Sequence, residues 1–432
     1  MKVCEKDVSR IWQDGRLRWL RDDAGNDVEV VYGGRPAVKP GCDFQDAVLR
    51  INGVKCCGDV EIHVTSDLWK KHGHHRNPAY NNVILHVVMW EKGGLPVFMH
   101  SGKNVPTVIL NADAMQIGGL PAGGCPHAKP ENGLREILTA CGLERLYGKS
   151  REFAGLMCSE PPQQALYRGI CRALGYASNK LQMEKLAVML PIFRWQRSAA
   201  GSGAAKRALV IGTAGLLPSQ RGGPCSGMRD DEALILEKEW CGIRDDVRPM
   251  QKQEWCFAGV RPANSPLRRV AALYGLIEKL GTGWLEYFQG LIEVTDMRRA
   301  EVTIEKNLVI NDIDYWSHHY DFGMKLARPM SVLGNGRARE ITINVILPFY
   351  LTYAVSMEDH AIINKIIDIY TGYPVLPENE ITRFMKLQLM PEERDCSNGC
   401  RQQGLIYIFQ TCCRTRDCEK CPVVKTRRQG WG

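Results

Sequence analysis

The sequence predicts an α+β fold in which a sheet-forming N-terminal part precedes a mostly helical part and a cysteine-rich tail. Three observations predict this order. Short β-branched runs fill residues 27–110, apolar residues recur at i, i+3 and i+4 intervals from residue 134 onward, and six cysteines gather between residues 396 and 421. We therefore expect a sheet domain over residues 1–125, a mostly helical domain over 131–390 and a tail over 391–432.

The N-terminal elements follow one another in a simple order. Ile11, Trp12, Trp19 and Leu20 stand at roughly helical spacing, which predicts a helix over residues 7–22. The runs DVEVVYGGRP, AVLRI and GDVEIHV predict three strands, and SDLWKKHGHHRNPAYNN a helical turn followed by a loop. VILHVVMW is almost continuously apolar, as in a strand buried on both faces. LPVFMH and TVILN extend the sheet.

The part that follows is helical by its periodicity. A Gly/Pro-rich linker over residues 118–133 leads into LREILTACGLERLYGK, and PQQALYRGICRALGY and LRRVAALYGLIEKLG continue the same pattern. ITINVILPFYLTYAVSM has no decisive period and is either a strand or a buried helix.

Length, charge and composition restrict the classes of protein that fit. The chain has 432 residues, of which 44% are hydrophobic and 24% charged, values typical of globular proteins. No apolar run is long enough to span a membrane, and the first twenty residues are not a secretory signal, so we expect a cytoplasmic protein. The formal net charge of +8 is compatible with a polyanionic partner. Most of the 17 cysteines are expected to be reduced in that compartment.

A candidate catalytic site follows from strand parity in GDVEIHV. Because side chains alternate along a strand, Asp59, Glu61 and His63 share one face, while the aliphatic residues between them share the core face. Asp43 leads the neighbouring strand. Two carboxylates can hold Mg²⁺ or Mn²⁺, which activates water for attack on a phosphodiester. The alternative is that these groups lie on the solvated face of an amphipathic sheet.

Histidines form a second candidate site. His72 and His74 belong to the HGHH group of the loop, and His63 and His86 stand on the flanking strands, with Asp67 between them. Imidazoles of this kind can hold Zn²⁺ or Mn²⁺. Alternatively, the loop histidines face solvent.

The tail and one helix start supply two further candidates. The tail set is a group of cysteines with ligand-like spacing: Cys396, Cys400, Cys413, Cys418 and Cys421. They would hold Zn²⁺ or an iron–sulfur cluster, unless they are unligated thiols. Arg261, Arg268 and Arg269 surround a predicted helix start, where a nucleic-acid phosphate could bind, although Ser265 could simply cap that helix.

Several blocks resemble an uncharacterised bacterial family, domain of unknown function 2851. They are GCDFQDAVLRI, GDVEIHVTSDLWKKHGHHRNPAYNNVILHVV, YRGICRALGY, KLAVMLP, IGTAGLL, FAGVRPANSPLRRVAAL, NGRAREITINVILPF and RQQGLIYIF. The resemblance spans almost the whole chain and implies no activity, because none is established for the family. Members usually have proline where Cys42 stands.

The N-terminal order of elements is also similar to the core of PD-(D/E)XK nucleases. That similarity implies that Asp43 and Glu61 bind the metal ion, that His63 replaces the usual lysine, and that Glu5 or Asp7 could add an acid. By the same analogy the tail cysteines would hold a stapling cluster. We therefore expect a Mg²⁺- or Mn²⁺-dependent nuclease. The alternatives are a non-catalytic nucleic-acid-binding protein and a histidine-metal hydrolase of another substrate.

Overall fold

The structure is a computed structural model in which the chain folds into two compact units. It describes residues 4–13, 17, 19–37, 41–110, 125, 133–176, 178–197, 202–222, 230–243, 248–257, 260–294, 297–311, 314–389, 396–414 and 417–429. Unit 1 comprises Met1–Cys141, Glu378–Ser397 and Arg401–Gly432, and unit 2 comprises Gly142–Pro377 and Asn398–Cys400. The sheet in the N-terminal part and the mostly helical remainder confirm the α+β class. Most residues of the predicted tail group with the N-terminal sheet in unit 1.

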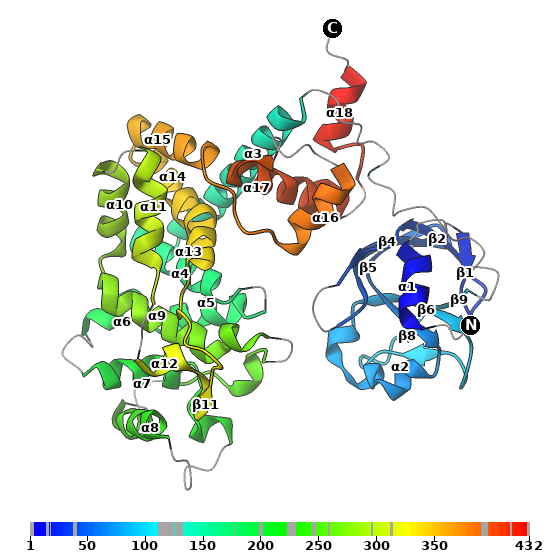
Figure 1. The fold of residues 1–432 in the computed structure, drawn as a ribbon, viewed down its shortest axis with the longest axis horizontal. Coiled ribbons are helices and arrows are strands. Elements are labelled where there is room, and N and C mark those ends of the chain that lie inside the picture. The colour runs from blue at the N-terminus through cyan, green and yellow to red at the C-terminus, as the bar shows by residue number, and fades with distance from the viewer. Residues whose placement is uncertain are drawn as a thin grey trace. The chain divides into compact units, whose positions relative to one another are not determined.

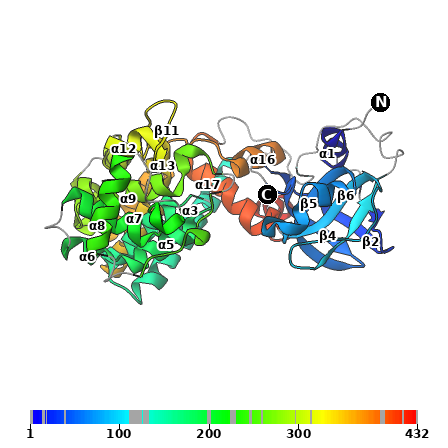
Figure 2. The same ribbon diagram turned by 90° about the horizontal axis from the view of Figure 1, so that it is seen from below.

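Unit 1 is built around a seven-stranded sheet. Its strands, found together in both views (Figure 1, Figure 2), are β1 (Trp19–Arg21), β2 (Asp27–Tyr32), β3 (Arg35–Pro36), β4 (Phe44–Ile51), β5 (Val54–Thr65), β6 (Val83–Trp90) and β9 (Thr107–Ile109). Their order is β1-β2-β4-β5-β6-β9, with β3 paired to β4. The strands predicted from AVLRI, GDVEIHV and VILHVVMW are β4, β5 and β6.

The sheet is mixed and its two edges meet. Strands β2, β4 and β5 form an antiparallel meander, whereas β6 runs parallel to β5 and β9 parallel to β6. The crossover from β5 to β6 contains α2 (Leu68–Lys71) and two 3₁₀ turns, η1 (His74–Arg76) and η2 (Pro78–Tyr80). Asp22 pairs with Val108 in an isolated bridge. The sheet therefore curls until the chain after β1 reaches β9.

Helix α1 (Glu5–Gln13) covers one face of this sheet (Figure 1). Val8 and Trp12 of α1 are buried in one core with Val60 and Ile62 of β5, so the aliphatic face of β5 is a core face, as strand parity predicts. The helix is shorter than predicted, because Trp19 and Leu20 belong to strand β1.

A second, smaller core lies around the crossover. It contains Cys42, Trp69, Tyr80 and Val83, together with residues of the hairpin β7 (Val97–Phe98) and β8 (Asn104–Val105).

The C-terminal elements of unit 1 are helical. They are α16 (Glu380–Leu389), α17 (Gly399–Ile408), the π-helical turn η11 (Phe409–Cys413) and α18 (Pro422–Gln429). Their apolar side chains form a separate core with Leu138 and Cys141 of α3 (Leu134–Met157). The predicted linker lies outside the described residues except for Cys125 and Gly133.

Unit 2 is almost entirely helical, and Figure 2 shows its helices packed around one another. Besides the rest of α3 it contains α4 (Pro162–Leu174), α5 (Lys180–Met189), α6 (Ile192–Arg197), α7 (Gly203–Thr213), α8 (Asp231–Ile243), α9 (Pro266–Leu280), α10 (Trp284–Val294), α11 (Met297–Leu308), α12 (Asp314–His318), the hairpin β10 (His319–Asp321) and β11 (Met324–Lys325), α13 (Asn335–Ile341), the π-helical turn η9 (Thr342–Ile346), α14 (Leu347–Ser356) and α15 (His360–Thr371). The segment that was either strand or helix is η9 and α14. Among the described helices, none has the length and apolarity needed to cross a membrane.

Candidate functional site

Asp43, just before β4, and Glu61 in β5 are joined by two hydrogen bonds in which each carboxyl group accepts from a backbone N–H of the other segment. The backbone N–H of Asp43 donates to Oε2 of Glu61 (3.1 Å), and the backbone N–H of Ile62 donates to Oδ2 of Asp43 (2.9 Å). Burial, followed by the neighbouring Glu61 charge, raises the pKa of Asp43 to about 6. Burial raises the pKa of Glu61 to about 8. Burial and mutual repulsion disfavour the ionised form of both carboxyl groups, and a bound cation would stabilise that form.

A β-bulge in β4 lies directly beside this acid pair. Register shifts between Phe44 and Ala47, and Asp46 adopts a left-handed backbone conformation (φ +59°). The backbone N–H of Asp46 donates to the Asp59 carboxylate (3.3 Å). The Asp46 carboxylate in turn accepts a hydrogen bond from Nε of Arg35 (3.0 Å). Bulges re-aim side chains next to sites of this kind. Asp59 therefore braces the bulge, although strand parity places it beside Glu61.

Three imidazole nitrogens converge on one point, and two of them, from His63 and His74, lie against the Glu61 carboxylate. Nε2 of His63 lies 3.2 Å from Nδ1 of His72 and 3.2 Å from Nε2 of His74. Oε1 of Glu61 lies 3.1 Å from Nε2 of His74 and 3.6 Å from Nε2 of His63. His63 and His74 are buried, whereas His72 is exposed and forms the outer side of the group. We refer to Glu61, His63, His72 and His74 as the histidine cluster.

The two buried histidines of the cluster carry little positive charge. Burial is the main cause that lowers the pKa of His63 to about 2 and that also lowers the pKa of His74. A neutral imidazole has one N–H and one lone pair, so each buried ring can present a lone pair to an ion. Ligand atoms bound to one ion at about 2.1 Å lie roughly 3–3.5 Å apart, close to the separations within this cluster. The residues present therefore fit a divalent transition-metal ion.

Hydrogen bonds behind the cluster orient the His63 ring. The hydroxyl of Thr107 can donate to the carbonyl of Val105 (3.3 Å), so that its oxygen accepts from Nδ1 of His86 (3.4 Å). Nε2 of His86 then accepts from Nδ1 of His63 (2.9 Å). This arrangement of protons leaves the lone pair of His63 Nε2 directed at the cluster. Such outer partners fix the tautomer of metal-binding histidines.

The loop before β6 reaches back over β5 because of its own packing. Trp69 of α2 is fully buried, and its indole N–H donates to the carbonyl of Phe98 (2.9 Å). Gly73 then takes a left-handed conformation (φ +76°) that favours glycine and turns the chain into η1. The Tyr80 ring lies against the His74 ring, with 3.9 Å between centroids. These contacts turn His74 inward.

The other acids considered from the sequence have different positions. Asp67 accepts from Oγ1 of Thr65 (2.5 Å) and Nζ of Lys71 (2.6 Å), and these bonds lower its pKa to about 2. Its carboxylate is therefore engaged by side chains that are its neighbours in sequence. Asp7 caps α1 by accepting from the Cys4 backbone N–H (2.9 Å). Glu5 lies close enough that its charge contributes to the raised pKa values of the acid pair.

The arginines that we expected to bind nucleic acid are mostly inaccessible. Arg268 is fully buried in α9, where its guanidinium donates to backbone carbonyls of Ala263, Trp316, His319, Met330 and Ser331. Arg269 is 3% exposed and donates to the carbonyls of Ala263 and Val332. Both side chains hold loops onto α9 and are not placed to contact a phosphate backbone. Arg261 is exposed.

The tail cysteines divide into two groups. Cys413, Cys418 and Cys421 line a hollow in unit 1. Cys396 and Cys400 are not among the residues that line it. A Cβ placed on Gly142 would meet the Cys400 sulfur at 2.7 Å, so that thiol packs against α3. The remote Cys125 lines the hollow instead. Cys125 could not be predicted from the spacing of the cysteines, because it lies far from the tail in the sequence.

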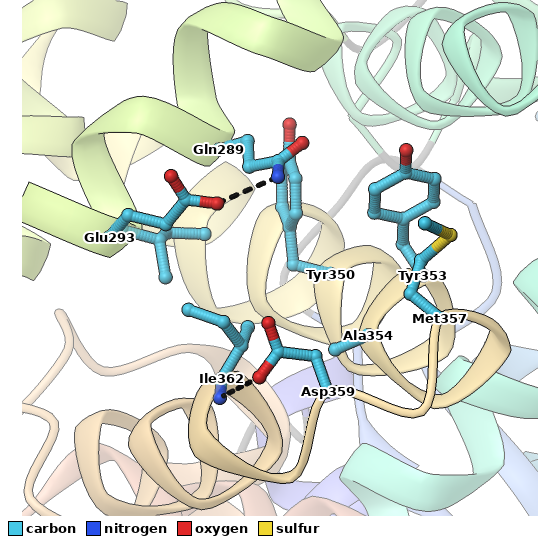
Figure 3. Close-up of a pocket in the computed structure, with 9 residues that line it drawn as sticks. Gln289, Glu293, Tyr350, Tyr353, Ala354, Met357, Asp359 and Ile362 are labelled. Atoms are coloured by element: carbon cyan, nitrogen blue, oxygen red, sulfur yellow. Dashed lines mark hydrogen bonds between the residues drawn. The ribbon is translucent and has the colours of Figure 1, made fainter.

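Unit 2 contains a hollow of a different kind, lined by residues of α10, α14 and α15 (Figure 3). Its acids are engaged locally. Glu293 accepts from the Gln289 amide (2.7 Å), and Asp359 caps α15 by accepting from the Ile362 N–H (3.0 Å), as the dashed lines in Figure 3 mark. The remaining lining is largely aromatic and aliphatic. This hollow therefore offers no converging set of metal-binding or catalytic groups.

Comparison with known proteins gives one match. A family model described as a protein of unknown function (DUF2851) matches residues 5–117 and 127–379, which include the acid pair and the histidine cluster but not the tail cysteines. Neither a curated protein nor a solved structure matches the chain.

Proposed function

This chain belongs to the DUF2851 family of proteins of unknown function, and we propose that it is a metal-dependent hydrolase of phosphodiesters in DNA or RNA. The observation that carries the proposal is the convergence of Glu61 with His63, His72 and His74 beside Asp43. The order helix, three antiparallel strands, crossover and parallel strand supports the resemblance to PD-(D/E)XK nucleases.

The donor set favours a particular class of metal ion. Mg²⁺ prefers oxygen ligands and water, whereas imidazole nitrogens suit Zn²⁺ and related ions, and mixed sets with a carboxylate also accept Mn²⁺. Nε2 of His63, Nε2 of His74 and Oε1 of Glu61 would bind the ion from the protein side, with Nδ1 of His72 at the exposed side. Mn²⁺ or Zn²⁺ is therefore the expected cofactor, in place of Mg²⁺.

Each residue then has a defined task. When bound, such an ion polarises a phosphoryl oxygen and lowers the pKa of a water molecule. Asp43 is a positioning residue, because its N–H holds Oε2 of Glu61 and leaves Oε1 to face the imidazoles. His86 and Thr107 hold the tautomer of His63. Exposed His72 stands where a substrate phosphate would arrive.

The direct test is cleavage by the purified protein. Single- and double-stranded DNA and RNA are incubated with Mn²⁺, Zn²⁺, Mg²⁺ or a chelator, and binding of each ion is measured separately by calorimetry. We expect Mn²⁺- or Zn²⁺-dependent cleavage that Glu61→Gln and His74→Ala abolish. Asp59→Asn is the matched control, because Asp59 stands two residues before Glu61 on β5 and contacts the bulge. A protein that binds no ion, or cleavage that survives Glu61→Gln, would refute the proposal.

A second candidate uses the same ion on another substrate. Burial of His63 and Glu61, and of the arginines that were expected to hold nucleic acid, favours a small phosphodiester or another small ester over a long polyanion. Hydrolysis of bis(p-nitrophenyl) phosphate without cleavage of any nucleic acid would select this candidate. Ion-independent, salt-sensitive binding of nucleic acid without hydrolysis would instead indicate the non-catalytic alternative.

A further inference from the structure

A second metal-binding constellation lies in unit 1, apart from the histidine cluster. Five cysteines line one hollow: Cys125, Cys412, Cys413, Cys418 and Cys421. All five are thiols and not disulfides. Cys412 and Cys421 also belong to the core of the C-terminal helices, and five thiols gathered around one hollow form a set that can bind a metal.

Three chain segments bring these thiols together. The backbone N–H of Cys125 donates to the carbonyl of Gln388 (2.8 Å), which fixes Cys125 against α16. Cys412 belongs to the π-helical turn η11, a type of turn often found at functional sites. The Asp417 N–H donates to the Cys412 carbonyl (2.9 Å), and the Cys421 N–H donates to the Cys418 carbonyl (3.2 Å). The backbone thus folds the last segment back onto the π-helical turn.

The surroundings of Cys421 suit a ligand sulfur. Backbone N–H groups of Val423 and Val424, at the start of α18, point at the Cys421 thiol. Cys412 and Cys125 line the same hollow as Cys421. N–H donors to sulfur stabilise metal-bound thiolates, and a bound cation removes the repulsion between neighbouring thiolates.

The spacing of the sulfurs distinguishes a cluster from a single ion. A zinc ion with four thiolates at about 2.3 Å holds its sulfurs roughly 3.8 Å apart. Among the described residues, donor atoms that all lie within 4.8 Å of one another are found in His63, His72 and His74, and the tail thiols form no such set. The thiols that line the hollow are thus farther apart than the ligands of one ion. A cubane cluster is larger than a single ion and takes four cysteine ligands.

We propose that Cys125, Cys412, Cys418 and Cys421 bind a [4Fe–4S] cluster. In the π-helical turn the proposed ligand is Cys412 rather than Cys413, because Cys412 is 4% exposed and lies next to Cys421. The cluster ties the isolated Cys125 to the C-terminal helices. It does not depend on the function proposed for the histidine cluster, and its test needs no activity measurement.

The test uses the full chain, purified without oxygen and reconstituted with ferrous iron and sulfide. We expect a brown protein with about four iron and four sulfide ions per chain and broad visible absorption. Serine substitutions of Cys125, Cys412, Cys418 or Cys421 should each lower the iron content at least twofold. Cys413→Ser and the exposed Cys158→Ser are matched controls that should retain it.

Several results would overturn the assignment. Wild-type protein that binds one zinc ion and no iron after reconstitution would replace the cluster with a zinc site. Full iron content in Cys125→Ser or in Cys412→Ser would remove that residue from the ligand set and refute the proposed set. Because the wild-type iron and sulfide content is measured without any substitution, a variant that fails to fold does not protect the proposal.

Discussion

Replacing Gly404 with alanine should destabilise the protein, although alanine is the better helix former. Gly404 lies in α17, and a Cβ at this position would stand 2.1 Å from the carbonyl oxygen of Leu138 in α3. Ordinary contact begins at 3.4 Å. The obstacle is backbone, which cannot rotate away as a side chain can. The two helices would have to separate by more than about 1 Å, with loss of packing on both sides.

The expected loss is about 2 kcal/mol. Overpacking a close contact costs about 1–3 kcal/mol, and a backbone obstacle places Gly404→Ala at the upper end of that range. The higher helix propensity of alanine offsets about 1 kcal/mol. For a unit of this size the loss corresponds to a fall in Tm of about 4–8 °C. Scanning calorimetry and urea unfolding followed by tryptophan fluorescence measure both quantities.

Gly155→Ala is the matched control for Gly404→Ala. Gly155 is exposed in α3, and a Cβ there would meet nothing within 4 Å. We expect this variant to gain up to about 1 kcal/mol from helix propensity alone. If Gly404→Ala were as stable as Gly155→Ala, the close approach of α17 to α3 would be wrong.

Three further predictions concern single side chains. Arg268→Met should lower the free energy of unfolding, measured by chemical denaturation, by about 3 kcal/mol or more, because buried carbonyl groups lose their hydrogen-bond donor. Arg261→Ala should change that free energy by less than about 0.5 kcal/mol. Equal effects of the two substitutions would contradict the burial of Arg268. Burial and the Arg145 charge lower the pKa of Lys149 from 10.5 to about 7, so the stability of the wild-type protein should rise with pH between these two values. Lys149→Met should raise Tm most below pH 7, where the buried amine is charged, and a gain in Tm independent of pH would contradict the lowered pKa. Trp69→Leu should weaken Mn²⁺ binding in calorimetry about tenfold, since Trp69 packs on His74; unchanged affinity would show that this packing does not position the ligand.

Strand periodicity predicts much of the sheet and one half of the candidate site. Side chains alternate with period two, so the aliphatic face of β5 and the face of Glu61 and His63 can be separated from sequence alone. The pairing of Asp43 with Glu61 follows because β4 and β5 are consecutive and joined by a tight connection. The bulge at Asp46 could not be predicted, since one extra residue changes which groups meet without changing the apolar pattern.

The other half of the site depends on contacts that spacing does not encode. His74 reaches Glu61 because Trp69 is buried beneath the crossover and Gly73 reverses the chain. Neither fact follows from the letters HGHH, which are equally compatible with a solvated loop. Cys125 is a similar case, because a thiol nearly 300 residues from the other cysteines that line its hollow has no local signal. Sequence patterns therefore describe elements well, and they describe poorly the long-range contacts that complete a site.

The discontinuity of unit 1 has a consequence for synthesis on the ribosome. The sheet of unit 1 is translated before Gly142–Pro377, yet the residues of unit 1 from Glu378 onward emerge only after that segment has been made. Domains generally fold as units while the chain is being synthesised, so most of the helical core can form before unit 1 is complete. A nascent chain that has reached Pro377 carries the sheet strands without α16, α17 and α18. Unit 1 therefore begins to form before unit 2 and is completed after it.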